Sequence, residues 1–347
     1  MNDRTILYSI DGTIGKIARY RGEKVILGKG ACYIKLKETV NADYIYYLLQ
    51  SSIFQAYLKS MTTGSTIHHI SLETMRNFSF ALPDRVIQDC IAKVLLVIDQ
   101  KIDLNTRICT ELESMARTIY DYWFAQFDFP DENGKPYRTS GGEMMWCQEL
   151  RREVPKGWKV SKLGTECKTL LGGTPDTSIC DYWDGDIPWL SSGEVASSPV
   201  VSSEKTITES GKVNSTTSFA HAGAVVISIT RYIRPSILGI DACFNQSIVA
   251  VIPTDTFHTS FIYPLMKSAV INYMNLRTGA QQPHINKETI DNTVILCPPI
   301  DVLKQYYQKV ECLFKRQLLL TRENQHLTYL RDWLLPMLMN GQAKVVL

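Results

Sequence analysis

Two long stretches of the chain repeat apolar residues at intervals of three and four positions. The first runs from about residue 85 to residue 126 and the second from about residue 301 to residue 339. Such spacing places apolar side chains on one narrow stripe of an α-helix, as in the seam of a coiled coil. The stripe positions are Ile87, Ile91, Val94, Ile98, Ile108, Leu112, Met115, Ile119 and Tyr122, and then Val302, Tyr306, Val310, Leu313, Leu320, Leu327, Leu330, Leu334 and Met337.

The two stripes predict a pair of long helices that pack against each other. Each segment of about 37 residues would form a rod of ~55 Å. Because each stripe is too narrow to be buried all round, the simplest arrangement is a helical hairpin in which each stripe covers the other. Lys101 and Asn105 fall on seam positions of the first helix. A polar seam residue fixes the register of the pair at a cost in stability.

Upstream of each predicted rod, the same succession of patterns occurs. Runs rich in β-branched residues predict two strands, and an apolar-periodic segment predicts a helix after them. The strands and helix fall at 5–10, 30–37 and 42–61 in the first copy, and at 224–229, 246–253 and 259–277 in the second. The chain is therefore predicted to have a mixed α/β (α+β) fold with an internal repeat.

A phrase of similar wording joins each predicted helix to its rod. It reads TGSTIHHISLET at 63–74 and TGAQQPHINKET at 278–289, and the same offset of 215 positions relates Pro83 to Pro298. Self-similarity at a fixed offset indicates repeated structural units. We expect the shared residues to be scaffold. Gln281 and Gln282, which differ from Thr66 and Ile67 in the first copy, are expected to differ in what they recognise.

The two copies are unequal in length. Residues 154–223 precede the strands of the second copy, whereas only the residues MNDR precede those of the first. The first domain is therefore expected to lack about 70 residues and to expose strand edges and apolar surface, so that it borrows structure from elsewhere or stands as a marginal fragment. The predicted organisation is a partial first domain at 1–83, a long helix at 84–126, a connector at 127–153, a complete domain at 154–300, a second long helix at 301–340 and a tail at 341–347.

Composition and charge narrow the class of protein. Hydrophobic residues make up 45% of the 347 residues, which is typical of globular proteins. No apolar run reaches the ~18 residues that a membrane-spanning helix needs, and no signal peptide is visible. The nine scattered cysteines form no C-x-x-C pair, so we expect unpaired thiols in a reduced, cytoplasmic chain. Divided by segment, the charge nowhere reaches the excess of a histone-like polycation, so charge alone would not supply tight DNA binding, and shape and base-edge contacts would have to contribute more.

Sequence signatures of catalysis are missing. The chain contains neither G-x-G-x-x-G after a strand nor a phosphate-binding P-loop, and it lacks the Asn/Asp-Pro-Pro-aromatic signature of an amino-methyltransferase. His68 and His69 are adjacent, but no further ligands stand at metal-binding spacing. The sequence therefore predicts a non-catalytic protein without a metal site or a bound cofactor.

Several stretches, taken in order with the double repeat, resemble a known family. They are VPKGWKVSKLG at 154–164, LLGGTPDTSICDYWDGDIPWLSSGEV at 170–195, CFNQSIVAVIP at 243–253, and YDYWFAQFDFP at 120–130 followed by SGGEMMW at 140–146. The chain resembles the specificity subunit of type I restriction–modification systems over nearly its whole length. The missing opening of the first target recognition domain is the departure from that pattern.

The resemblance implies a fold, an activity and partners. Each target recognition domain would read one half of a split site in double-stranded DNA, and the antiparallel helices would set the distance between the halves. The subunit would direct partner methyltransferase subunits, which use S-adenosylmethionine to methylate adenine, and would allow recruitment of a translocating endonuclease. Rods of ~55 Å correspond to about one and a half turns of duplex at ~34–36 Å per turn.

The residues expected to contact DNA fall in both copies. In the second domain, glycines allow close backbone approach to phosphates, polar side chains reach phosphates or base edges, and Arg or Gln pairs with guanine or adenine. An ordinary surface turn remains the alternative for the glycines, a solvated loop for the arginines, and a solvated hairpin for the lysine and arginine of the first domain. The candidates are Gly172, Gly173, Thr174, Tyr182, Ser191, Ser192, Arg231, Tyr232, Arg234, Gln281, Gln282, His284 and Lys287, with Lys16, Arg19, Thr66 and His69 in the first domain; Trp189 is expected in the core.

A second function stays open beside the DNA-reading one. The incomplete first domain is compatible with a non-reading interaction protein, the inactive product of a recombined recognition cassette, or with self-association through that domain. Methylation of a split motif by the partner methyltransferase would favour the DNA-reading function. Absence of any modified motif would favour the alternative.

Overall fold

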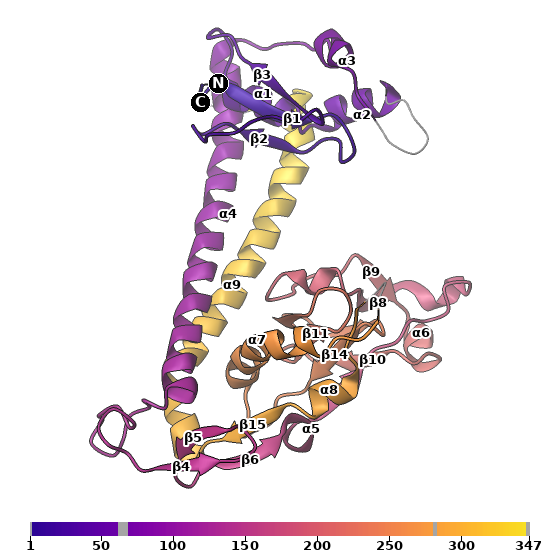
Figure 1. The fold of residues 1–347 in the computed structure, drawn as a ribbon. Helices are drawn as coiled ribbons and strands as arrows, with labels where there is room; N and C mark the ends of the chain where they lie inside the picture. The colour runs from indigo at the N-terminus through magenta and orange to yellow at the C-terminus, as the bar shows by residue number, and fades with distance from the viewer. Residues whose placement is uncertain (1, 62–68, 280–282, 345–347) are drawn as a thin grey trace. The chain divides into compact units, whose positions relative to one another are not determined.

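The chain folds into two compact units in a computed structural model that describes residues 2–61, 69–279 and 283–344. Unit 1 comprises Met1–Asn105 and Glu323–Leu347, and unit 2 comprises Thr106–Arg322. Each unit therefore contains part of both long helices. Figure 1 shows the succession of elements along the chain.

Unit 1 is built on a three-stranded antiparallel sheet of order β2-β1-β3. Its core joins Tyr8 of β1 to Phe54, with their rings 5.7 Å apart, and to Leu95 of the long helix. The aromatic and aliphatic residues predicted for the strands therefore form one small core. The elements are β1 Thr5–Ser9, β2 Ile17–Arg19, β3 Ala31–Lys35, α1 Ala42–Leu48, α2 Ser52–Met61 and α3 Leu72–Asn77.

Unit 2 has two four-stranded sheets, of order β12-β11-β14-β7 and β10-β13-β8-β9, and two short pairs, β15-β6 and β4-β5. The strands are β4 Met144–Cys147, β5 Arg152–Pro155, β6 Lys159–Lys162, β7 Thr169–Leu171, β8 Trp183–Leu190, β9 Lys205–Ile207, β10 Ser218–Ala220, β11 Val225–Ser228, β12 Arg234–Ile237, β13 Ala242–Phe244, β14 Ile248–Val251 and β15 Val294–Cys297. The helices are α5 Leu163–Glu166, α6 Glu209–Val213, α7 Thr259–Asn275 and α8 Lys287–Asp291, with 3₁₀ turns at Cys180–Tyr182 and Glu194–Ala196.

Both faces of the sheet that contains β11 and β14 are covered. Val225 and Val249 face a core that includes residues of α7, whereas Val226 and Ala250 face a core shared with the other sheet. Figure 1 shows α7 on one side of β11 and β14 and the strands β8 to β10 on the other. This double burial explains why β14 reads as an unbroken apolar run instead of alternating with polar residues.

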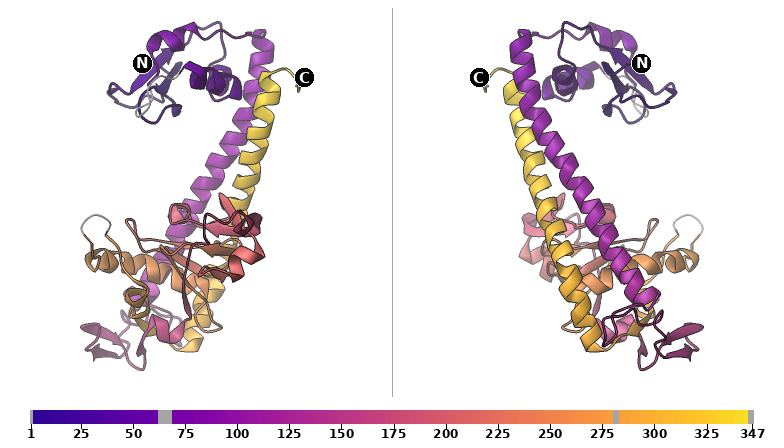
Figure 2. Two further views of the ribbon diagram at one scale, coloured as in Figure 1. Left: turned by 90° about the vertical axis from the view of Figure 1, so that its right-hand side faces the viewer. Right: turned by 90° about the vertical axis from the view of Figure 1, so that its left-hand side faces the viewer.

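The long helices α4 (Arg85–Tyr120) and α9 (Ile300–Met339) pack side by side and antiparallel (Figure 2). In unit 1, Arg331 Nη1 lies 3.0 Å from Asp99 Oδ1, and Asn105 Nδ2 donates to Asn324 Oδ1 at 3.0 Å. In unit 2, the Cys109 thiol lies 3.7 Å from the Gln317 carbonyl oxygen. The prediction of two long packed helices in a mixed α/β fold is confirmed. A π-helical turn, Asp121–Ala125, continues α4.

The predicted seam is right at Asn105, which is completely buried, and wrong at four apolar positions, of which Tyr122 and Leu330 are 38% and 41% exposed. Ile87 and Met115 are 49% and 52% exposed, whereas Leu95 and Ala116 are buried instead. An α-helix has 3.6 residues per turn, so a straight helix drifts ~20° per heptad from a strict 3.5-residue repeat. The contact stripe therefore moves around α4 along its length.

The residues predicted as a connector contribute to the core of unit 2. Phe127 and Phe129 pack around Trp158, with ring centroids 5.5 and 5.2 Å from it, and β4 and β5 form a hairpin nearby in sequence. All nine cysteines are unpaired, as expected. Within the described ranges, no helix combines the length and the apolar character that crossing a membrane requires.

Candidate nucleic-acid interface

Hydrogen bonds join four loops of unit 2, three of them through the backbone and the fourth through the side chains of Thr174 and Gln246, and we call these loops the loop rim. The rim comprises the described residues of 172–174, 229–234, 245–247 and 283–285. Ile229 N–H donates to Ser247 O and Ile285 N–H donates to Ile229 O, both at 2.9 Å. Arg231 N–H donates to Pro283 O, also at 2.9 Å. The rim therefore joins segments that are more than a hundred residues apart in the sequence.

The predicted basic–aromatic cluster lies on this rim, in the loop that joins β11 to β12 and at the first residue of β12. The guanidinium carbon of Arg234 lies 4.7 Å from the ring centre of Tyr232, and that of Arg231 lies 5.7 Å from it. Tyr232 is 56% exposed. In the described part of the chain, neither arginine has a carboxylate partner at ion-pair distance. Two guanidinium groups without local acidic partners suit phosphates or guanine edges.

Arg231 adopts an unusual backbone conformation, with a φ of +55°. A side chain in this left-handed region costs roughly 1–2 kcal/mol relative to the right-handed one. The corresponding turn of unit 1 has Gly12, with a φ of +67°, directly after Ile10 and Asp11. Glycine adopts that conformation without a steric cost. Retention of an arginine where glycine fits more easily points to a role for its side chain.

The second copy of the repeated phrase, residues 278–289, is hydrogen-bonded to the loop that follows β11. His284 and Thr278 pair through reciprocal backbone hydrogen bonds of 2.9 Å, and His284 also bridges to Thr230. Ile285 is only 3% exposed, and the Asn286 side chain accepts from Thr289 N–H at the start of α8. His284 therefore stands beside the β11–β12 loop, and its contact with DNA stays a prediction.

Unit 1 contains the same backbone contacts between its copy of the phrase and the residues that follow β1. Ile70 N–H donates to Ile10 O at 2.9 Å, and His69 bridges to Asp11. Ser71 caps α3 as Asn286 caps α8. The shared "HI" residues are therefore scaffold in both units, and the exposed His69 side chain remains a candidate for DNA contact.

The glycine pair lies inside the protein and not in a surface turn. A Cβ at Gly172 would lie 2.1 Å from Asn245 O, and one at Gly173 would lie 2.3 Å from Thr216 Oγ1. Both glycines are buried. The close approach that they permit is therefore to this chain's own backbone, and the surface-turn interpretation is wrong.

Thr174 follows the glycines and is exposed. Its hydroxyl donates to Gln246 Oε1 at 2.5 Å. Gln246 is also exposed and lies in the turn between β13 and β14, so it belongs to the rim although the sequence reasoning did not select it. The signal was present as a polar Asn-Gln-Ser run between two buried strands. A glutamine side chain can pair with adenine through two hydrogen bonds.

Other DNA-contact candidates of unit 2 pair with carboxylates of this chain or are partly buried. Lys287 Nζ lies 2.6 Å from Asp291 Oδ2 within α8. Ser191 donates through its backbone N–H and its hydroxyl to Glu194 Oε2, at 2.7 and 2.8 Å, and Ser192 beside it is half-buried. Trp189 is 6% exposed, as predicted for a core residue.

Tyr182 is half-buried and stands in acidic surroundings. The exposed acidic residues of this stretch are Asp176, Asp181, Asp184 and Asp186. Their carboxylates would repel a phosphate backbone, which makes this part of unit 2 a poor surface for DNA.

In unit 1, the two basic candidates differ. Lys16 is exposed, whereas Arg19 Nε lies 3.0 Å from Asp43 Oδ1 and the guanidinium carbon lies 3.9 Å from the Tyr46 ring centre. Arg19 therefore ties β2 to α1. Thr66, Gln281 and Gln282 lie outside the described residues.

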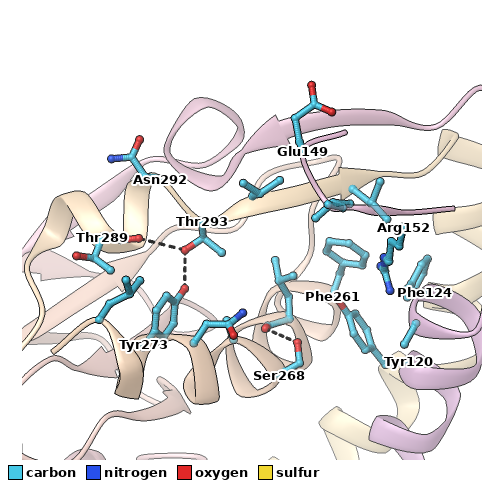
Figure 3. Close-up of a pocket in the computed structure, with 18 of the residues that line it drawn as sticks. Tyr120, Phe124, Glu149, Arg152, Phe261, Ser268, Tyr273, Thr289, Asn292 and Thr293 are labelled. Atoms are coloured by element: carbon cyan, nitrogen blue, oxygen red, sulfur yellow. Dashed lines mark hydrogen bonds between the residues drawn. The ribbon is translucent and has the colours of Figure 1, made fainter. Parts of the chain in front are cut away.

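A pocket of about 770 Å³ in unit 2 (Figure 3) is lined by none of the rim residues. It is bordered by α7, α8, β15 and the end of α4. Tyr273 and Thr293 share a 2.6 Å hydrogen bond in it, and burial raises the pKa of Tyr273 to about 12. A phenol that stays protonated at neutral pH is a structural donor here and a poor base.

The described residues also offer neither a reactive thiol among the buried cysteines nor a cluster of metal ligands. Burial raises the pKa of Cys167 to about 12 and those of Cys243 and Cys297 to about 11, so these thiols stay protonated and unreactive near neutral pH. In the portion of the chain that the structure describes, no group of three or more His, Cys, Asp and Glu residues could hold a metal ion.

Comparison with known proteins assigns the family. The family model "Type I restriction modification DNA specificity domain" matches residues 1–114 and 155–329. The type I restriction enzyme MjaIX specificity subunit of Methanocaldococcus jannaschii is 24% identical, over 98% of this chain and 78% of that protein. The HindI specificity subunit of Haemophilus influenzae is 22% identical, over 86% of this chain and 77% of that protein.

A solved structure shares the fold. The type I restriction–modification S subunit from M. genitalium superposes with a TM-score of 0.56 at 16% identity, over 97% of this chain and 83% of that chain. Type I complexes combine a specificity subunit with methylation and restriction subunits and DNA. The specificity subunit is non-catalytic, and S-adenosylmethionine is used by the methylation subunit. The chain therefore belongs to the type I restriction–modification DNA specificity family, and it acts as the subunit that determines the DNA target.

Proposed function

We propose that unit 2 reads one half of the DNA target through its loop rim. The observation that carries this proposal is Arg231, an exposed cation held at a φ of +55° beside Tyr232 and Arg234. Gln246 and His284 flank this cluster on neighbouring loops. Arginine pairing with guanine and glutamine pairing with adenine would supply base readout, while Tyr232 and the second arginine position the backbone.

Unit 1 is proposed to be a partial recognition domain that contributes less to readout. Gly12 stands at the turn where unit 2 has Arg231, and Arg19 is tied up with Asp43. Lys16 and His69 remain its exposed candidates for DNA contact. A second function, as an interaction module that reads no DNA, is therefore favoured for unit 1 and not for unit 2.

The remaining parts of the chain are assigned by the same proposal. Residues 1–83 and 154–300 form the recognition domains, and 84–126 and 301–340 form the spacer helices that dock the methyltransferase subunits. Residues 127–153 connect the two halves, and 341–347 form the tail. The complex works on DNA in the cytoplasm, and an endonuclease subunit joins it where restriction accompanies methylation.

Co-expression with the methyltransferase subunit of the same system tests the proposal. Single-molecule sequencing of the host DNA for methyladenine should reveal one motif, of which the part read by unit 2 changes or is lost in the double variant Arg231→Ala, Arg234→Ala. Lys205→Ala, which removes an exposed cation on β9 away from the rim, is the matched control and should leave the motif and its rate unchanged. An unchanged motif in the arginine double variant would remove the rim from readout.

A further inference from the structure

The turn that joins β13 to β14 in unit 2 is fixed by hydrogen bonds on both sides of its tip. Ile248 N–H donates to Asn245 O at 3.1 Å, and Ser247 N–H donates to Asn245 Oδ1 at 3.0 Å. Asn245 N–H donates to Leu190 O of β8 at 3.0 Å. Both flanking strands are buried along their whole length, whereas Gln246 at the tip is exposed. The backbone of Gln246 is therefore held in place before any ligand binds.

The glycine pair that precedes Thr174 is bonded to the strands on both sides of this turn. Gly172 N–H donates to Ile248 O at 3.0 Å, and Gly173 N–H donates to Phe244 O at 2.9 Å. Because backbone atoms of the turn already fill the space that a Cβ at position 172 needs, only glycine allows the loop to come this close. The glycines therefore bring the residue after them to the tip of the turn.

Buried neighbours restrain the loop that contains Thr174. Trp189 is 6% exposed, and its Nε1–H donates to Gly173 O at 3.2 Å. Pro175, on the other side of Thr174, is buried as well. Thr174 itself is exposed. Its backbone is thus anchored from both sides while its side chain stays at the surface.

The Thr174 hydroxyl holds the Gln246 side chain. Thr174 Oγ1 donates to Gln246 Oε1 at 2.5 Å. Among the residues with described positions, no further hydrogen bond involves the Gln246 side chain. The amide therefore keeps both Nε2 protons and one lone pair of Oε1 for a ligand. Adenine in the major groove presents an N7 acceptor and an N6 donor, which match Nε2 and Oε1.

We propose that Thr174 is a positioning residue for base readout, which holds the amide of Gln246 ready to pair with adenine and does not itself bind DNA. A glutamine side chain loses rotamer freedom when a ligand orders it. The hydroxyl of Thr174 orders the side chain beforehand, so less freedom is lost on binding. The inference rests on the proposed function, since it requires unit 2 to read DNA through the loop rim.

Binding of the assembled methyltransferase to a set of duplexes tests the proposal. The duplexes carry the motif that methyladenine sequencing finds for the wild-type chain, with every base pair replaced in turn. Gln246→Ala should lower the discrimination at one A·T pair roughly 5- to 150-fold. Thr174→Val keeps the shape of the side chain and removes the hydroxyl. It should lower discrimination at the same base pair about 2- to 10-fold, the effect of one neutral hydrogen bond.

Two further variants separate positioning from direct contact with DNA. Thr174→Ser keeps the hydroxyl and should preserve discrimination to within about twofold of the wild-type value. The double variant Thr174→Val, Gln246→Ala should discriminate like Gln246→Ala alone, because a residue that acts through Gln246 adds nothing once the amide is removed. Equal weakening on every duplex by Thr174→Val, or additive losses in the double variant, would overturn the proposal and assign Thr174 to phosphate contact.

The double variant Arg231→Ala, Arg234→Ala separates a failure of this inference from a failure of the proposed function. If the arginine variant changes the motif while Gln246→Ala and Thr174→Val leave every base preference unchanged, the inference is overturned and the proposed function stands. If none of these variants changes a base preference, unit 2 does not read DNA through the loop rim and both are overturned.

Discussion

Units 1 and 2 share a local design and differ in what covers it. Both contain three antiparallel strands in the same arrangement. In both, the isoleucine of a His-Ile pair donates its N–H to the carbonyl oxygen of the residue that follows β1 or β11. In unit 2, β7 pairs beside Ala250 and β6 pairs with Ile295, and both residues are buried, whereas their equivalents Tyr33 and Phe80 are 53% and 40% exposed. Strand pairing therefore follows the local sequence, whereas burial depends on which other segments pack over the strands.

The recognition loops differ in the same informative way. The turn after β1 is made by Gly12 and the turn after β11 by Arg231, and both have positive φ values. The backbone path is therefore common to the two units, while only one of them has a cation at its tip. Two recognition domains can differ in specificity without differing in fold when one turn of a repeated scaffold has different side chains.

The first prediction contrasts a buried residue of unit 2 with an exposed residue of unit 1. Phe244→Ala removes a completely buried ring of unit 2, and we expect a loss of about 3–5 kcal/mol in the free energy of unfolding. Ile26→Ala changes a side chain that is 99% exposed, and we expect a change within about 0.5 kcal/mol. Chemical denaturation of the two variants, followed by circular dichroism, measures both values.

A large loss in Ile26→Ala would contradict the comparison, because it would mean that the isoleucine is already covered in solution. Amide exchange localises the effect of Phe244→Ala. Strands β8, β13 and β14 should exchange faster, while β1 and β3 of unit 1 should keep the wild-type rate.

Much of the fold was predictable because the periodicity of apolar residues and the internal repeat are visible in short segments of the sequence. The repeated phrase, the strands at 5–10 and 224–229 and the two long helices all have periodic or duplicated signals. The seam was less predictable, since Met115 fits a heptad but faces solvent once the helix drifts from a 3.5-residue repeat.

The candidate site was predictable in part. The Arg-Tyr-x-Arg cluster is visible as residues, but its proximity to His284 and Gln246 depends on hydrogen bonds between distant loops. For the glycine pair, the sequence suggested a surface position that the structure does not have. A Gly-Gly dipeptide reads as a turn, yet Gly172 is buried because the Asn245 backbone passes at the position of a Cβ. Only tertiary packing decides between these outcomes.

The second prediction separates backbone strain from recognition at Arg231. Arg231→Gly gives unit 2 the residue that unit 1 has at this turn. We expect the free energy of unfolding to stay the same or rise by up to about 1 kcal/mol, since relief of the left-handed strain exceeds or offsets the added chain entropy. Affinity of the assembled methyltransferase for its target duplex should fall roughly 5- to 150-fold, the equivalent of about 1–3 kcal/mol.

The salt dependence of binding distinguishes the two kinds of contact that Arg231 could make. Loss of a phosphate contact should reduce the slope of log K against log salt by about 0.9, with similar weakening on all sequences. Loss of a base contact should instead relax the preference at one base pair. Lys205→Ala is the control cation outside the rim, and equal weakening by it would refute a specific role for Arg231.

The smallest expected effect concerns the caps that follow the repeated phrase. Ser71 accepts from Thr74 N–H at 3.0 Å in unit 1, and Asn286 accepts from Thr289 N–H at 2.8 Å in unit 2. Alanine at either position should cost about 1 kcal/mol locally and speed exchange of the capped amide about fivefold. Since Asn286 directly follows the rim residue Ile285, Asn286→Ala should also weaken DNA binding slightly, whereas Ser71→Ala should not. Equal effects of the two variants on DNA binding would mean that unit 1 contributes to reading as much as unit 2, and the functional contrast between the units would then have to be abandoned even though their structural contrast stands.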